Sequence, residues 1–201
     1  MAKTKQVRLS TQERKIQIKE NILSIIFNEG MQKLSTRYLA QKIGISEGAL
    51  FRHYPSKRAM IEGIIQDVSD ELIEELKIIA SLNEAATSRL EKYICFTINY
   101  LFEKKGITLL LFTEASYKNE AGLKQVMSSI YKSQKHYFAK IILDGIAEGI
   151  WDENINVDHL TSLYMGIPVT MNIETILHLE TFNHNEFCKQ MEYFILKVLA
   201  K

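Results

Sequence analysis

Hydroxyl, cationic and very small side chains are concentrated in one short stretch of the chain, and these side-chain types suit contact with a nucleic acid. Hydroxyl and cationic groups donate hydrogen bonds to phosphate oxygens, and a small side chain lets the backbone approach a base edge closely. The candidate residues are Thr36, Arg37, Ser46, Glu47, Gly48, Ala49, Phe51, Arg52, His53, Tyr54 and Lys57. We expect them to form an interface with double-stranded DNA.

Two short helices joined by a tight turn are needed to position these side chains, and residues 35–54 have the pattern of a helix-turn-helix. Gly44 permits the left-handed backbone of the turn, and Ser46 stands at the N-cap of the second helix. The apolar positions that pack the two helices together are Leu39, Ala40, Ile43, Ile45 and Leu50. The second helix then presents its slim N-terminal end to a major groove.

Charge is divided unevenly along the chain. Residues 1–58 hold 12 Lys and Arg against 4 Glu, whereas the rest of the chain holds 13 against 20 Asp and Glu. The net charges of the two parts are therefore +8 and −7, which the overall value of +1 conceals. A basic N-terminal part suits a polyphosphate partner, because neutralising phosphates releases counterions.

The stretch from about Thr11 to Met60 resembles the DNA-binding domain of the tetracycline-repressor (TetR) family of transcriptional regulators. The match rests on the segments 34–36, 39–40, 44–46 and 48–57. Two positions depart from the commonest family pattern, since Phe51 stands where Tyr is usual and Tyr54 where Phe is usual. The missing hydroxyl at position 51 bears on one phosphate contact that the family makes.

We expect two kinds of DNA contact from the candidate residues. Phosphates are held by Thr36, Arg37, His53, Tyr54 and Lys57, whereas Glu47, Gly48, Ala49, Phe51 and Arg52 face bases or their methyl groups. Arg52 is the expected donor to a guanine or a phosphate.

Apolar residues have helical spacing almost throughout the chain, and only two prolines and nine glycines interrupt it. The sequence predicts an all-α protein, in which a fourth helix links a three-helix DNA-binding head, residues 1–56, to a larger helical effector-binding and dimerisation body, residues 57–201. The first helix begins after a capping box at Ser10 and ends at Gly30. Later helices are expected at 56–80, 84–104, 107–116, 120–149, 157–180 and 184–200.

Aromatic residues and methionines of the body lie at inward-facing positions. The family resemblance implies that some of them line an apolar pocket for a small hydrophobic effector, whereas for any single one of them a place in the ordinary core is the favoured alternative. The candidates are Phe96, Tyr100, Phe112, Tyr131, Phe138, Tyr164, Met165 and Pro168. Pro168 follows Gly166 inside a helical pattern, which predicts a kink that opens such a pocket.

The last two helices carry apolar residues on more than one face. One face can pack inside the body, and a second face suits the interface of a homodimer, as the resemblance also implies. The interface candidates are Leu163, Ile167, Ile176, Phe187, Met191, Phe194 and Ile195. Packing of the same residues inside a monomer is the alternative.

Other classes of function find little support in the sequence. We find no phosphate-binding glycine loop, no His-Glu-x-x-His and no Gly-x-Ser-x-Gly, so we expect no enzyme, no cofactor and no metal site. Cys95 and Cys188 are far apart with no secretory leader, and are expected to be reduced and packed. No apolar run approaches the ~20 residues that span a bilayer, so we expect a cytoplasmic protein without a membrane partner.

These features together predict a homodimeric transcriptional regulator. It is expected to repress transcription by binding a palindromic DNA operator, and to be released when a small hydrophobic effector binds the body. The alternative is an architectural DNA-binding protein without an effector. A large cavity in the body would argue against that alternative.

Overall fold

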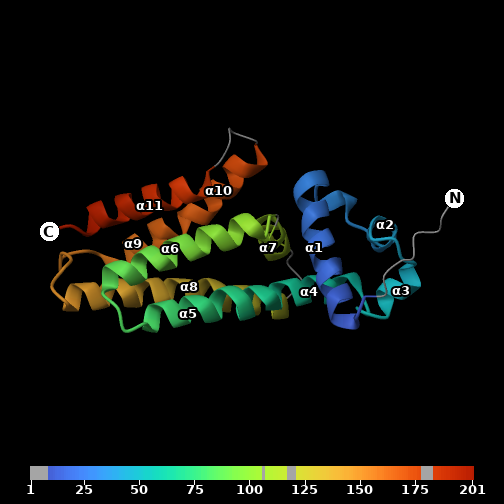
Figure 1. Cartoon of the computed structure of the whole chain (residues 1–201), viewed down its shortest axis with the longest axis horizontal. Coiled ribbons are helices and arrows are strands. Elements are labelled where there is room, and N and C mark those ends of the chain that lie inside the picture. The colour runs from blue at the N-terminus through green and yellow to red at the C-terminus, as the bar shows by residue number, and fades with distance from the viewer. Residues whose placement is uncertain (1–8, 106, 117–120, 178–182) are drawn as a thin grey trace. The chain divides into compact units, whose positions relative to one another are not determined.

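The computed structural model of the chain describes residues 9–105, 107–116, 121–177 and 183–201, and every regular element in these ranges is helical (Figure 1). The expected all-α fold is therefore confirmed. The chain divides into two compact units, the first ending at Ile64 and the second running from Ile65 to Lys201. No helix in the described ranges is both long enough and apolar enough to span a bilayer.

The first unit is a small helical head. Its elements are α1 (Thr11–Glu29), the 3₁₀ turn η1 (Met31–Lys33), α2 (Thr36–Lys42), α3 (Glu47–Phe51) and the first part of α4 (Lys57–Asp67). The predicted capping box starts α1, because Ser10 Oγ accepts from the Glu13 amide at 3.2 Å and the Glu13 carboxylate accepts from the Ser10 amide at 2.7 Å. The apolar stripe of α1, Leu39 on α2 and Leu50 on α3 are almost fully buried, and α2 packs against both α1 and α3.

The turn between α2 and α3 has the backbone that the sequence predicted. Gly44 has a φ of +73°, a conformation that a side chain disfavours. The amide of Ile45 donates to the Ala40 carbonyl at 3.0 Å, which closes the end of α2. The turn therefore fixes the direction in which α3 leaves α2.

The second unit is a larger helical body. It contains the π-helical turn η2 (Val68–Ile73), α5 (Glu74–Ser81), α6 (Ala86–Glu103), α7 (Ile107–Ser116), α8 (Ala121–Ala147), α9 (Val157–Tyr164), α10 (Gly166–Ile176) and α11 (His184–Leu199). α6 packs against α5, α8 and α11, and α8 also packs against α5, α7 and α9. α6 and α8 therefore form the centre of the body.

Two of the long helices expected from the sequence are interrupted. The helix expected at 56–80 consists of α4, the wider turn η2 and α5. The helix expected at 157–180 divides at Met165 into α9 and α10, and its last residues, 178–180, lie outside the described part of the chain. Apolar spacing extends across both interruptions, so the hydrophobic pattern alone did not reveal them. A π-helical turn adds one residue per turn locally and is often found near a functional site.

Aromatic rings form the middle of the body core. The ring centroid of Phe138 lies 4.2 Å from that of Tyr164 and 5.9 Å from that of Tyr93. The buried hydroxyl of Tyr164 donates a hydrogen bond to Thr97 Oγ1 at 2.9 Å, and burial raises the pKa of Tyr164. These rings are thus satisfied members of the core.

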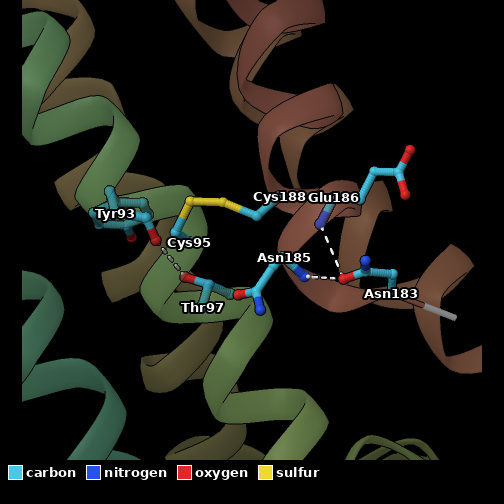
Figure 2. Close-up of a disulfide and its surroundings, with 7 residues drawn as sticks. All are labelled: Tyr93, Cys95, Thr97, Asn183, Asn185, Glu186 and Cys188. Atoms are coloured by element: carbon cyan, nitrogen blue, oxygen red, sulfur yellow. Dashed lines mark hydrogen bonds between the residues drawn. A yellow bond between two sulfur atoms is a disulfide. The ribbon is translucent and has the colours of Figure 1, made fainter.

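Cys95 on α6 and Cys188 on α11 form a disulfide (Figure 2). Their Cα atoms are 5.2 Å apart, which is within the usual range for a disulfide. The expectation of two reduced thiols is therefore wrong. The packing of α6 against α11 brings together residues that are 93 positions apart, and no local spacing in the sequence signals such a pairing.

Candidate functional site

The first turn of α3 is the most accessible part of the candidate DNA interface. Glu47, Gly48, Phe51 and Arg52 are exposed, and Ala49 is partly exposed. A Cβ atom placed on Gly48 would meet no other atom within 4 Å. The surface in front of Gly48 is therefore open, as a close approach to a base edge requires.

Side-chain hydrogen bonds fix the start of both helices of the motif. Ser35 Oγ accepts from the Tyr38 amide at 3.2 Å, and Ser46 Oγ accepts from the Ala49 amide at 3.1 Å. Thr36 Oγ1 donates to the carboxylate of Glu47, which joins the first turn of α2 to the first turn of α3. Thr36 and Glu47 thus also position the helices on which they lie.

A second polar cluster ties α1 to α2. The Tyr38 hydroxyl donates a hydrogen bond to one carboxylate oxygen of Glu29 at 2.6 Å, and Lys42 Nζ donates to the other oxygen at 2.5 Å. These two hydrogen bonds, from Lys42 first and Tyr38 second, hold the pKa of Glu29 below its ordinary value. The carboxylate is therefore charged at neutral pH and anchors α2 on α1.

Three predicted phosphate ligands also have contacts inside the head. Lys57 Nζ donates to the Leu34 carbonyl at 2.9 Å, so Lys57 holds α4 against the start of α2. Tyr54 is 7% exposed, and Lys15 Nζ lies 5.5 Å from the centroid of its ring. Nδ1 of His53 is buried without a hydrogen-bond partner in the described part of the chain, which leaves Nε2 as its atom for a phosphate.

Two arginines complete the candidate surface. Arg37, in the first turn of α2, and Arg52, at the C-cap of α3, are both exposed. Exposed Lys33, in η1, adds a charge that the sequence reasoning did not single out, because it precedes the motif. The head thus offers exposed cations on η1, on α2 and at the C-cap of α3.

The body contains a cavity of about 730 Å³, within the size range of small-molecule sites. Of the predicted effector residues, Tyr131, Met165 and Pro168 line it. The wall also contains many aliphatic residues that were not predicted, because they cannot be told from core residues by spacing. The lining residues are Val68, Leu72, Leu101, Ile107, Thr108, Leu111, Lys124, Met127, Ser128, Ile130, Tyr131, Gln134, Ser162, Met165, Gly166, Pro168 and Val169.

The other predicted effector residues lie elsewhere. Phe138 and Tyr164 belong to the aromatic core, and Phe96 stacks on Tyr100 with ring centroids 6.3 Å apart. None of these four is among the residues that line the cavity. The side chain of Phe112 lies outside the described part of the structure.

Exposed apolar side chains gather on the last three helices. Of the predicted interface residues, Leu163 and Phe194 are 63% and 58% exposed. Ile167, Phe187 and Met191 are partly exposed, Ile195 is buried, and the side chain of Ile176 lies outside the described part. Other exposed apolar residues in this part of the chain, which the interface candidates do not include, are Ile173, Leu177, Tyr193 and Val198.

Comparison with known proteins gives this arrangement a family. The family model of the bacterial regulatory proteins of the tetR family matches residues 23–64. A nucleoid occlusion factor, SlmA, of Actinobacillus pleuropneumoniae serotype 5b is 30% identical over 135 residues, which span 66% of this chain and 66% of that protein.

Solved structures share the fold over nearly the whole chain. The ketosteroid transcriptional regulator KstR2 of Mycobacterium tuberculosis aligns with a TM-score of 0.80 and 17% identity, covering 94% of this chain and 95% of that one. The transcriptional regulator FadR of Bacillus subtilis, in complex with stearoyl-CoA, aligns with a TM-score of 0.69 and 16% identity, covering 92% and 97%. The chain belongs to the tetR family of bacterial regulatory proteins.

Proposed function

We propose that the chain is a homodimeric transcriptional repressor that binds a palindromic DNA operator and is released by a small, mainly hydrophobic effector. The observation that carries the proposal is the exposed first turn of α3, where the surface at Gly48 is open and exposed Arg52 follows at the C-cap of the same helix. Such a turn suits the major groove, because small groups admit base edges and cations bind phosphates.

The proposal assigns each exposed group of the head a role on DNA. Arg37 and Lys57 bind phosphates, together with the Nε2 atom of His53. Gly48 and Phe51 lie against base edges or thymine methyl groups, and Arg52 donates to a guanine or a phosphate. Thr36 and Glu47 contribute to DNA binding chiefly by holding α2 and α3 at the required angle, because their side chains are hydrogen-bonded to each other.

A dimer is proposed because one α3 covers only one half-site. Two heads related by a two-fold axis bind two half-sites one helical turn apart, or a multiple of it. The exposed apolar residues of α11, including Phe194 and Val198, suit a bundle with the same helix of a second copy.

Effector coupling is proposed to act through η2. Val68 and Leu72 of this π-helical turn line the cavity, and α4, which carries Lys57, directly precedes η2 in the chain. A ligand that repacks η2 therefore shifts α4 and the head. A coupling free energy of ~1 to 3 kcal/mol is enough to change operator affinity about 5- to 150-fold.

An architectural DNA-binding protein without an effector remains the second candidate, which the resemblance to the nucleoid occlusion factor favours. The cavity of about 730 Å³ favours the regulator, since a protein whose body serves only assembly has no need of such a space.

A gel-shift titration tests the proposal. The full-length protein is titrated against DNA from immediately upstream of its own coding region, at stated salt, with random DNA as competitor. We expect saturable binding at nanomolar protein that survives the competitor. If random competitor DNA displaced the upstream DNA as effectively as the same upstream DNA does, this result would instead support the architectural candidate.

Arg37→Ala is the variant for testing the phosphate contacts. We expect it to weaken binding to all DNA sequences alike and to reduce the salt dependence. Arg37 serves better than Lys57 here, because removing Lys57 also breaks its hydrogen bond to the Leu34 carbonyl inside the head.

A further inference from the structure

One wall of the body cavity is polar. Lys124, Ser128 and Tyr131 line it from α8, at spacings of four and three residues, so they lie along one face of that helix. Lys124 is the one charged side chain among the lining residues that the structure describes. The polar wall therefore has positive charge.

A second cation lies at the edge of the same wall. Lys135 Nζ is 3.3 Å from Ser162 Oγ and 6.0 Å from the centroid of the Tyr131 ring, and both of these residues line the cavity. Lys135 follows Lys124 by three turns of α8, which places both on the same side of the helix. The positive potential thus extends along the wall.

The facing walls are apolar. Val68 and Leu72 come from η2, Leu101 from α6, and Ile107 and Leu111 from α7. The described lining residues include no Asp or Glu, and Lys124 makes no ion pair with any described carboxylate. A cation at the edge of an apolar surface attracts an anion, and the attraction strengthens when a bound ligand displaces water from around the charge.

We infer that the cavity binds an amphipathic anion, with an apolar chain or ring system against η2, α6 and α7 and a carboxylate or phosphate group beside Lys124. The inference rests on the proposed effector site and specifies the class of its ligand. A neutral molecule of the same apolar size gains no ion pair with Lys124, and a cationic one meets repulsion.

Calorimetric titration with amphiphiles of one chain length tests the charge requirement. Dodecanoate, dodecyl phosphate, 1-dodecanol and dodecyltrimethylammonium are titrated into the full-length protein below the concentrations at which they form micelles. We expect at least one of the two anions to bind about tenfold or more tightly than the alcohol, and the ammonium to bind least. Comparison of the two anions identifies the head group that the site prefers.

Lys124→Met tests the position of the charge, and Lys132→Met is the matched control, because Lys132 is an exposed residue of α8 that does not line the cavity. Lys124→Met is expected to weaken binding of the preferred anion about tenfold or more while leaving the alcohol unchanged. Lys132→Met should bind both like the unchanged protein. Thermal unfolding of each variant verifies that the body is folded.

Three results would overturn the inference: equal or tighter binding of the alcohol or the ammonium, no binding of any amphiphile, or equal anion affinity in the Lys124→Met and Lys132→Met variants. The gel shift separates this failure from that of the proposed function. A protein that binds operator DNA but no amphiphilic anion refutes only the ligand class. A protein that binds the anion through Lys124 but binds no DNA refutes the regulator and leaves the ligand class standing.

Discussion

The two surfaces proposed to meet partners are constructed in opposite ways. In the head, α3 has only 5 residues and presents Glu47, Gly48 and Phe51, with Arg52 at its C-cap. Side-chain hydrogen bonds from Ser46 and Thr36 hold its first turn in place. In the body, α11 has 16 residues and presents large apolar groups such as Tyr193 and Phe194. Recognition of a base edge depends on the placement of a few atoms, whereas an apolar interface depends on buried area.

The largest effect is expected where an added side chain blocks the surface of α3. Gly48→Leu should reduce operator affinity to the level of non-specific binding, about 10³-fold or more, because the new side chain holds the backbone away from the bases. The fold should persist, since the space around Gly48 is open. Gel shifts measure the affinity, and Gly122→Leu, at another exposed open glycine, is the matched control. An unaltered footprint for Gly48→Leu would refute the docking.

Removal of the disulfide should affect the body and leave the head unchanged. Cys95→Ser is expected to lower the free energy of unfolding of the body by about 2 to 4 kcal/mol, because the unfolded chain gains freedom. Denaturant titration followed by circular dichroism measures this change, and operator affinity of the folded protein should stay the same. Reduction of the unchanged protein with dithiothreitol should give the same midpoint, and a midpoint unaffected by reduction would contradict the prediction.

A charge on α11 should weaken the proposed dimer. Phe194→Glu is expected to raise the dimer dissociation constant about 30-fold or more, because a carboxylate replaces a large apolar contact. Sedimentation velocity over a range of concentrations measures the constant. Lys189→Glu, which also introduces a carboxylate on α11 at an exposed position, should have little effect because it lies on a different face. Equal effects of both variants would place the interface elsewhere.

Two helix caps allow the head and the body to be compared at a smaller scale. Ser46→Ala and Asn183→Ala each remove a side chain that accepts backbone amide hydrogen bonds at a helix start, so each should lower stability by about 1 kcal/mol. Only Ser46→Ala should also weaken operator binding, because it loosens α3. Parallel denaturation and gel-shift measurements test this difference, and equal DNA affinity in the two variants would contradict it.

The smallest effect concerns pH. Burial, with the like charge of Glu91, raises the pKa of Glu192 above its ordinary value of 4.5. Folding therefore favours the protonated carboxyl, and this contribution to stability is present at low pH and is lost as pH rises through the raised pKa. Glu192→Gln should stabilise the body at pH 7 by about 0.5 kcal/mol or less, with no gain at pH values below the ordinary pKa. Thermal unfolding across pH measures it.

Glu91→Gln is the matched variant for this pair. It removes the same repulsion from the side of α6, so its gain in stability should appear in the same pH range. The double variant should be little more stable than Glu192→Gln alone. Independent, additive gains would show that the two carboxylates do not interact.

The head could be predicted from the sequence because its signals are local. Ser10 with Glu13, the turn at Gly44 and the cap at Ser46 each act within a few residues, and all three have the predicted geometry. The internal bonds of Lys57 and Thr36 could not be predicted in this way, because their partners lie 23 and 11 residues away.

The body was harder to predict because its features arise from packing between distant helices. The apolar spacing located its helices but gave no sign of the interruptions at η2 and Met165. Aromatic content directed attention to Phe138 and Tyr164, which are core, whereas the cavity wall consists mainly of aliphatic residues and the polar face of α8. The spacing of Lys124, Ser128 and Tyr131 was the signal in the sequence that could have located that wall.

The bond between Cys95 and Cys188 makes a covalent ring of the chain between them. Among the described residues that line the cavity, all but Val68 and Leu72 belong to this ring. A protease that cuts one peptide bond inside the ring therefore releases no fragment, and the cut chain migrates as a single band on a gel until a reductant is added. The ligand site would keep its covalent connections after such a cut.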